Sequence, residues 1–236
     1  MTELLYLQDS YAQHCEATII AVQHRQVVLN KTVFYPTGGG QPHDTGNIVC
    51  NNQTYAVLSV QKKDGTVFHE LDQEGLRIGD QVHCMIYWKR RYLLMRYHSA
   101  AHVLAGVFSK ELGTEITGGQ LAVDKGRFDF ALADFTKEKI EEIFQQANAV
   151  IAQDFPIHAY TLPKEEALQD PTLFKLANKE YIEKLQEVRV VDIVGFDKQA
   201  DGGTHVRSLK EIGAVHLLKI ENRGKNNKRI YFNLNE

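Results

Sequence analysis

Short strand-like segments separated by turn signals fill the first 88 residues, and they limit most strongly what this chain can fold into. Five segments are rich in β-branched and aromatic residues: residues 15–22, 26–30, 54–60, 66–71 and 80–87. Pro36 with the glycines at 38–40, Asp64-Gly65 and Gly79-Asp80 are typical of turns between them. Several short strands at this spacing predict a small barrel or sandwich.

The pattern changes at about residue 89. Apolar residues at helical spacing predict a long helix over 88–112, which Gly113 ends. A hairpin over 116–132 and an amphipathic helix over 136–153, capped by Thr136, are expected next. The remaining segments predict strands over 158–162, 188–194, 214–221 and 228–235, and helices over 164–170 and 171–186.

Strands and helices are mixed without a regular βαβ alternation, which favours the α+β class over a doubly wound sheet. We therefore expect a small β-barrel-like domain over residues 1–88, packed on an α+β domain over residues 89–236. In the helix predicted over 136–153, the inward-facing residues are Ile140, Ile143, Phe144, Ala147 and Ile151.

The composition excludes several classes of protein. The 236 residues carry a net charge of −3, whereas a protein that binds nucleic acid over its whole surface is strongly basic. The composition does not exclude binding of a phosphate backbone by a local basic patch. Cys15, Cys50 and Cys84 are too few for a disulfide framework and lack the spacing of a cysteine metal site. Neither a signal peptide nor a membrane-spanning segment is recognisable, so we expect a cytoplasmic protein with no membrane partner. No obligate protein partner is evident in the sequence.

Two histidines, His98 and His102, lie four residues apart within the predicted long helix. This spacing places both imidazoles on one helix face, about 5–6 Å apart at Cβ, where they can bind one metal ion. Histidine pairs at this spacing are also common without a metal. Ser99 occupies the position of the general base in HExxH metallopeptidases, so a peptidase of that kind is disfavoured.

The segment Asp201-Gly-Gly-Thr-His205 is the second candidate for chemistry. Two consecutive glycines predict a tight backbone turn that can aim Asp201 and His205 inward. The alternative is a surface loop with an incidental histidine. Together with His98 and His102, this segment offers three imidazoles and one carboxylate, a set that fits zinc.

A glycine-rich segment, residues 32–46, is the third candidate. Gly38, Gly39 and Gly40 follow a proline and allow the backbone to approach a ligand closely. A barrel turn without a ligand is the alternative. A phosphate-binding P-loop is not supported, because no GK[ST] follows the glycines.

Four motifs resemble those of the editing domain of alanyl-tRNA synthetases: HSAAH, the hairpin ITGGQLAVDKGRFDF, the helix that ends in QQANAVIAQDFPI, and DGGTHVRSLKEIG. With the glycine-rich segment in front, the chain resembles the free-standing alanyl-tRNA editing proteins of the AlaX type, in their medium-length form. The resemblance implies one zinc ion per chain, held by His98, His102 and His205. Asp201 occupies the position of the family's cysteine. It is then a direct carboxylate ligand or a partner that orients a histidine, and loss of the metal is a third possibility.

The implied activity is hydrolysis of the ester that joins a wrong amino acid to the tRNA for alanine. Serine is the chief candidate and glycine the second. A synthetase pocket made for alanine cannot strongly reject an isostere that merely adds a hydroxyl, so a second sieve is required. The two alternatives are a protein of the same fold that binds tRNA or metal without hydrolysis, and a zinc hydrolase of another ester or amide.

The resemblance also suggests substrate contacts. Thr32 is the candidate for reading the serine hydroxyl, the glycines at 38–40 for close approach of the backbone, and Gln120 for a polar contact near the ester. Four basic residues precede His98 and are candidates for contacts with the tRNA backbone: Lys89, Arg90, Arg91 and Arg96. Thr32 is otherwise a strand residue, Gln120 a solvent-facing hairpin residue, and the basic run a solvated face.

Overall fold

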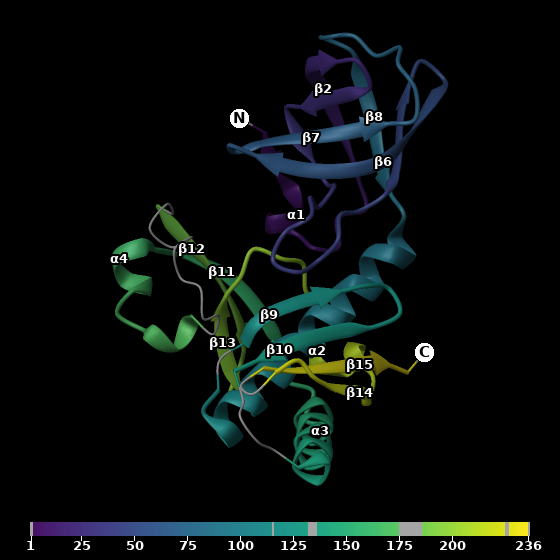
Figure 1. Ribbon diagram of the computed structural model, residues 1–236. Helices are drawn as coiled ribbons and strands as arrows, with labels where there is room; N and C mark the ends of the chain where they lie inside the picture. Colours follow the sequence, from purple (N-terminus) through teal and green to yellow (C-terminus); the bar gives the residue numbers. More distant parts are fainter. Residues whose placement is uncertain (1, 115, 132–135, 175–185, 225–226, 236) are drawn as a thin grey trace. The chain divides into compact units, whose positions relative to one another are not determined.

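The fold is taken from a computed structural model, which describes residues 2–114, 116–131, 136–174, 186–224 and 227–235. The chain forms two compact units, residues 1–94 and residues 95–236, called here the first and second unit (Figure 1). The first contains a closed barrel and the second a mixture of helices and sheets, which confirms the predicted α+β class. The domain boundary expected near residue 88 stays a prediction; a helix, α2, begins at Trp88.

Six antiparallel strands close the barrel of the first unit, in the order β2-β3-β7-β6-β5-β8. Their bounds are β2 His14–Gln23, β3 Gln26–Leu29, β5 Gly46–Cys50, β6 Gln53–Lys63, β7 Thr66–Leu71 and β8 Gln81–Ile86. Alternate residues point into a buried apolar core that includes Ile19, Leu29, Ile48 and Val60. Before and beside the barrel lie β1 Glu3–Leu4, α1 Leu5–Gln8 and β4 Lys31–Thr32, with β1 parallel to β4.

Five of the six barrel strands match the predicted segments, and β5 was not expected. It begins at Gly46, the last residue of the glycine-rich segment, and contains only five residues. At Gly46 a Cβ atom would lie 2.1 Å from the carbonyl oxygen of Met85, so the close pairing of β5 with β8 requires glycine at this position. Gly46, which the sequence places in a turn-rich segment, therefore allows β5 and β8 to approach each other.

The second unit is built on two sheets. A four-stranded sheet has the order β14-β15-β10-β9, with β9 Ile116–Leu121, β10 Gly126–Phe130, β14 Val215–Asn222 and β15 Lys228–Leu234. Helix α2, Trp88–Leu112, packs its Phe108 on Phe130 of β10, with ring centroids 4.4 Å apart. Helix α3, Lys137–Ile151, lies beside β14 (Figure 1). The smaller sheet has the order β11-β12-β13, with β11 Ile157–Pro163, β12 Glu187–Ile193 and β13 Asp197–Ala200.

Helix α3 confirms its prediction closely. The Thr136 side chain accepts a hydrogen bond from the backbone N–H of Lys139, and all five residues predicted to face inward are buried. The helix predicted over 164–170 is shorter, α4 Lys164–Ala167. Of the helix predicted over 171–186, the short 3₁₀ turn η1 Pro171–Leu173 is seen, and residues 175–185 lie outside the described part. A second 3₁₀ turn, η3, covers Leu209–Ile212. Within the described residues, no helix combines the length and apolar character needed to cross a membrane.

Candidate metal centre

Four side chains meet in the second unit: those of His98, His102, Asp201 and His205. The two helical histidines lie one turn apart on α2, and the loop after β13 supplies the other two residues. One potential ligand atom from each residue lies within 4.8 Å of the others. Asp201 Oδ2 is 3.0 Å from His205 Nε2, and Asp201 Oδ1 is 3.5 Å from His98 Nε2. Two segments separated by about a hundred residues thus form one group that could bind a metal ion.

The loop over residues 201–205 is held by its own hydrogen bonds and by Arg189. The backbone N–H of Gly203 donates to Asp201 Oδ2 at 2.6 Å. Arg189 Nη1, from β12, donates to the carbonyl oxygens of Asp201 and Gly203, each at 3.0 Å. A Cβ at Gly203 would lie 2.2 Å from His98 Cε1, so only glycine leaves room for the imidazole at this point.

Burial decides the charge of the three histidines. It lowers the pKa of His98, lowers that of His102 well below its usual value, and lowers that of His205 to about 4. Burial raises the pKa of Asp201, but His98 and the hydrogen bond from His205 lower it further, so the net direction is strongly downward. At neutral pH the group therefore offers neutral imidazoles and a carboxylate, the protonation states that bind metals.

One buried nitrogen supports a metal at this position. His102 Nδ1 is among the few buried polar side-chain atoms of the described residues that have no hydrogen-bond partner. Such atoms are rare, because an unpaired buried polar group costs free energy. The backbone of His102 is fixed by Gln199, whose Nε2 donates to its carbonyl oxygen at 3.1 Å. Three imidazoles, one of them with this unpaired nitrogen, and a carboxylate fit a divalent ion of the zinc type.

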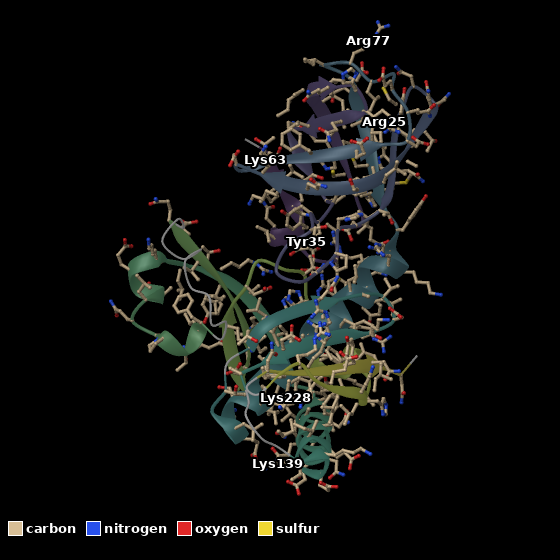
Figure 2. All side chains as sticks on the ribbon, viewed as in Figure 1. Arg25, Tyr35, Lys63, Arg77, Lys139 and Lys228 are labelled. Atoms are coloured by element: carbon tan, nitrogen blue, oxygen red, sulfur yellow. The ribbon has the colours of Figure 1, made fainter. Side chains whose placement is uncertain are left out.

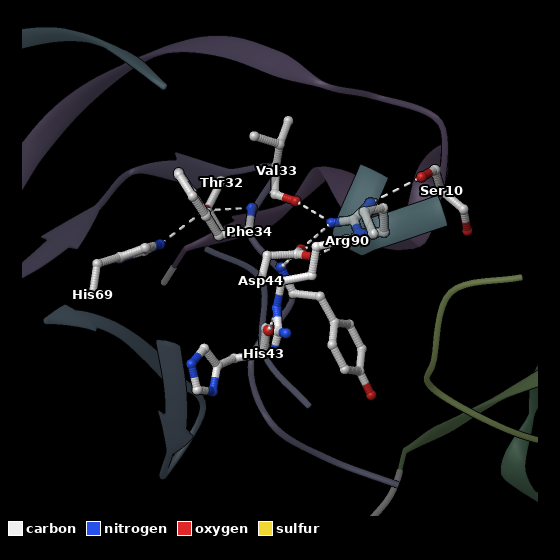
Figure 3. Close-up of polar contacts among 10 residues, drawn as sticks. Ser10, Thr32, Val33, Phe34, His43, Asp44, His69 and Arg90 are labelled. Carbon is white, nitrogen blue, oxygen red and sulfur yellow. Dashed lines mark hydrogen bonds and ion pairs between the residues drawn. The ribbon is translucent and has the colours of Figure 1, made fainter. Parts of the chain in front are cut away.

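Thr32 lies in the first unit and already has hydrogen-bond partners (Figure 3). Its side chain is fully buried, its Oγ1 lies 2.9 Å from His69 Nε2, and the same oxygen accepts from the backbone N–H of Phe34 at 3.1 Å. His69 Nδ1 lies 3.3 Å from the carbonyl oxygen of Val27, which only accepts, so the neutral ring carries its hydrogen on Nδ1 and Nε2 accepts from the Thr32 hydroxyl. One lone pair of Oγ1 is then not used by these two contacts. Recognition of the amino acid by Thr32 stays a prediction.

The three glycines form a tight turn in the first unit. Gly38 and Gln41 exchange backbone hydrogen bonds, and Gly39 and Gly40 between them have φ angles of +56° and +79°. This left-handed backbone conformation favours glycine at both positions, so the turn explains Gly39 and Gly40 without invoking a ligand. Close approach of these glycines to a substrate stays a prediction. Gln120 is an exposed residue of β9 whose Oε1 accepts from Arg127, and its contact with a substrate also stays a prediction.

The structure corrects the expectation that Arg91 contacts the tRNA backbone. Its guanidinium is fully buried, forms an ion pair with Asp44, and donates to the carbonyl oxygens of Ser10 and Val33. Figure 3 labels these three partners. Because this guanidinium is fully buried and paired with a carboxylate, the predicted contact of Arg91 with tRNA phosphate is wrong. The sequence alone does not distinguish the buried Arg91 from the exposed Lys89 or the half-buried Arg90 and Arg96.

The other three basic residues keep their predicted role as a proposal. Lys89 is exposed, Arg90 donates from Nε to the carbonyl oxygen of His43, and Arg96 donates to the carbonyl oxygens of Ile212 and Asn235. Positive side chains occur in both units rather than in one cluster, as the labelled Arg25, Lys63 and Arg77 of the first unit and Lys139 and Lys228 of the second illustrate (Figure 2).

Two residues that support the metal group were missed by sequence reasoning. Gln199 is buried in β13 and lies two residues before Asp201, so the alternation of a strand could have pointed to it. Nothing in the sequence around Arg189 indicates that its guanidinium binds the carbonyls of a loop twelve residues later. Such contacts depend on the antiparallel pairing of β12 with β13.

Comparison with known proteins gives two family matches and several similar chains. The family described as tRNA synthetases class II (A) matches residues 4–90, and the one described as Threonyl and Alanyl tRNA synthetase second additional domain matches residues 188–231. The chain is 43% identical to the Alanyl-tRNA editing protein AlaX-M of Methanosarcina barkeri, over 99% of both proteins. It is 40% identical to the protein of the same name from Saccharolobus solfataricus, over 98% of both. An alanine–tRNA ligase of Ignicoccus hospitalis is 35% identical over 92% of this chain and 24% of the ligase.

Proposed function

The chain belongs to the family of AlaX-M alanyl-tRNA editing proteins, and from this premise we propose that it deacylates mischarged tRNA for alanine in trans. Proteins of this family are deacylating hydrolases, so the chain is an enzyme that cleaves an aminoacyl ester. The proposed substrate carries serine first and glycine second. Both are amino acids that a pocket for alanine cannot strongly exclude by size alone.

The group of His98, His102, Asp201 and His205 is the observation that carries the proposal. We propose that these residues hold one zinc ion. Bound there, zinc would supply positive charge and Lewis acidity beside the ester or its attacking water. The chain's own residues prepare the place: burial keeps the imidazoles neutral, the carboxylate of Asp201 balances charge, and Gly203 leaves room for the ring of His98.

Recognition of the substrate is assigned to other residues. Thr32 is proposed to meet the serine hydroxyl, the glycines at 38–40 to allow close approach of the backbone, and Gln120 to contact the aminoacyl end. Lys89, Arg90 and Arg96 are proposed to contact the phosphate backbone of the acceptor stem. A net charge of −3 supports local contacts of this kind rather than binding over the whole surface.

A deacylation assay tests the function directly. The protein is incubated with alanine tRNA charged with serine, glycine or alanine, and release of the amino acid is followed. We expect the serine ester to be hydrolysed faster than the alanine ester, and the variant His98→Ala/His102→Ala to lose both bound zinc and hydrolysis. Lys137→Ala, which changes an exposed residue of α3, is the control and should keep both.

Three results would contradict parts of this proposal. Full hydrolysis by the metal-free double variant would remove zinc from it. Binding of tRNA and zinc without hydrolysis would make the chain a binding protein of the editing fold. Hydrolysis of small esters or amides but not of charged tRNA would assign it another substrate.

A further inference from the structure

Ser99 follows His98 in the chain, but its side chain contacts His205. Ser99 is fully buried, and its Oγ lies 3.1 Å from His205 Nδ1. The same oxygen accepts from the backbone N–H of Val206 at 3.2 Å. The other ring nitrogen of His205, Nε2, lies 3.0 Å from Asp201 Oδ2 and is thus on the side of the metal group. Ser99 therefore holds the end of the ring opposite to the end that faces the candidate ligands.

The hydrogens of this arrangement can be assigned from chemistry. A neutral imidazole carries one hydrogen, and a carboxylate only accepts. With the hydrogen on Nε2, His205 donates to Asp201, and Nδ1 accepts from the Ser99 hydroxyl. When Nε2 gives its lone pair to a metal, the hydrogen lies on Nδ1 and donates to Ser99 Oγ. The serine hydrogen can then turn to a carbonyl oxygen of the preceding helical turn, a bond that serine commonly makes in helices.

A hydroxyl at this position therefore satisfies Nδ1 in both tautomers. A methyl group satisfies neither, and a carboxylate, the side chain at the same position of HExxH peptidases, satisfies only the Nδ1–H form. The oxygen also accepts from the backbone N–H of Val206, the residue after His205, so it is held next to the ring by two contacts. Ser99 lies in α2, whereas His205 and Val206 lie in the loop after β13. The hydrogen bonds of Ser99 therefore also link the two segments that supply the candidate ligands.

We propose that Ser99 is a positioning residue of the metal centre: its hydroxyl holds the His205 ring through Nδ1 and so keeps Nε2 directed at the metal. The inference rests on the metal centre of the proposed function. It adds a role for a residue that touches neither metal nor substrate. Partners of this kind orient metal-binding imidazoles, and their removal typically weakens metal affinity about 10–100-fold.

The test measures zinc affinity of the whole chain by competition with a chelator. Ser99→Ala should weaken zinc binding about 10–100-fold. Ser109→Ala removes the same hydroxyl from the same helix, away from the metal group, and should leave zinc affinity unchanged. Imidazole ¹⁵N NMR of the zinc-loaded protein gives a second measurement: the Nδ1–H of His205 should be protected from exchange, and should exchange rapidly in Ser99→Ala.

The measured zinc affinities and spectra either support or overturn the proposed role of Ser99. Zinc affinity within twofold of the unsubstituted protein, in a folded Ser99→Ala variant, would overturn it. If that variant does not fold, the spectrum of the unsubstituted protein decides, because a rapidly exchanging Nδ1–H or a metal bound at Nδ1 would also overturn it. Zinc binding that depends on Ser99 in a protein without deacylase activity would support it while refuting the proposed function. No zinc binding by the unsubstituted protein would refute the centre and this inference together.

Discussion

At position 203, a single added carbon tests the geometry of the metal group. A Cβ there would lie 2.2 Å from His98 Cε1, 2.3 Å from His98 Nδ1 and 2.9 Å from Asp201 Oδ2. Gly203→Ala must therefore displace the imidazole or the loop. We expect a loss of about 1–3 kcal/mol in the free energy of unfolding, as for other overpacked sites, together with weaker zinc binding. Denaturant unfolding of the metal-free protein and chelator competition measure the two effects.

Gly202 supplies the matched control. A Cβ at this position has no heavy atom within 4 Å, and its φ is not in the left-handed region. Gly202→Ala should therefore leave stability and zinc affinity close to those of the unsubstituted protein. Equal losses in both variants would show that the loop needs backbone flexibility rather than room for His98.

Burial of His69 predicts that the free energy of unfolding depends on pH. Burial lowers its pKa to about 4 inside the first unit. The unfolded chain, where histidine has a pKa of about 6.5, binds the proton more tightly than the folded protein. The stability linked to this group is therefore present above about pH 6.5 and is lost as pH falls toward 4, to a total of about 3 kcal/mol. Urea unfolding at pH 7 and pH 5 should show the loss, and His69→Gln should reduce it. An unchanged pH dependence in that variant would contradict the assignment.

At the scale of elements, Arg91 ties the first turns of α2 to the loop after β4. Its guanidinium pairs with Asp44, and Asp44 Oδ2 also accepts from the backbone N–H of Tyr35 at 2.7 Å. Removing one partner of a buried ion pair leaves the other charge uncompensated, which costs about 3–5 kcal/mol. We expect Arg91→Met to destabilise the protein by this amount in denaturant unfolding. Arg91→Met/Asp44→Leu should lose less than the sum of the two single variants, and additive losses would show that the pair is not coupled.

The elements also show what the sequence can predict. Helix α3 was predicted almost to its ends, because a capping threonine and a helical apolar period agree. Strand β13 was missed, because its sequence DKQA is polar and only Gln199 is buried. The two halves of the metal group were each recognised by local spacing. Their meeting, and the roles of Arg189 and Gln199, depend on strand pairing that no local pattern encodes.

At the scale of the whole molecule, the candidate residues are divided between the two units. Thr32 and the glycine-rich turn belong to residues 1–94, and the four candidate metal ligands belong to residues 95–236. Each unit also has its own family match, at residues 4–90 and 188–231. We therefore predict that a substitution in the first unit can change selection of the amino acid without changing hydrolysis of its ester.

Thr32→Val tests this separation, because it keeps the shape of the side chain and removes the hydroxyl. Loss of a hydrogen bond to the serine hydroxyl should reduce kcat/KM for seryl-tRNA by the equivalent of roughly 1–3 kcal/mol. Glycyl-tRNA, whose amino acid has no hydroxyl, should be hydrolysed almost as before. The substitution also leaves His69 Nε2 and the N–H of Phe34 without Thr32 as a partner, so some loss of stability is expected in the first unit.

Two comparisons separate selectivity from stability in that experiment. Thr32→Ser keeps the hydroxyl and should retain the ratio of seryl to glycyl hydrolysis. The glycyl reaction of Thr32→Val reports the amount of folded, active protein, because it does not use the hydroxyl. A fall in both reactions by the same factor would assign Thr32 to the fold of the first unit, where it already bonds His69 and Phe34. A fall in the seryl reaction alone would assign its remaining lone pair to the substrate.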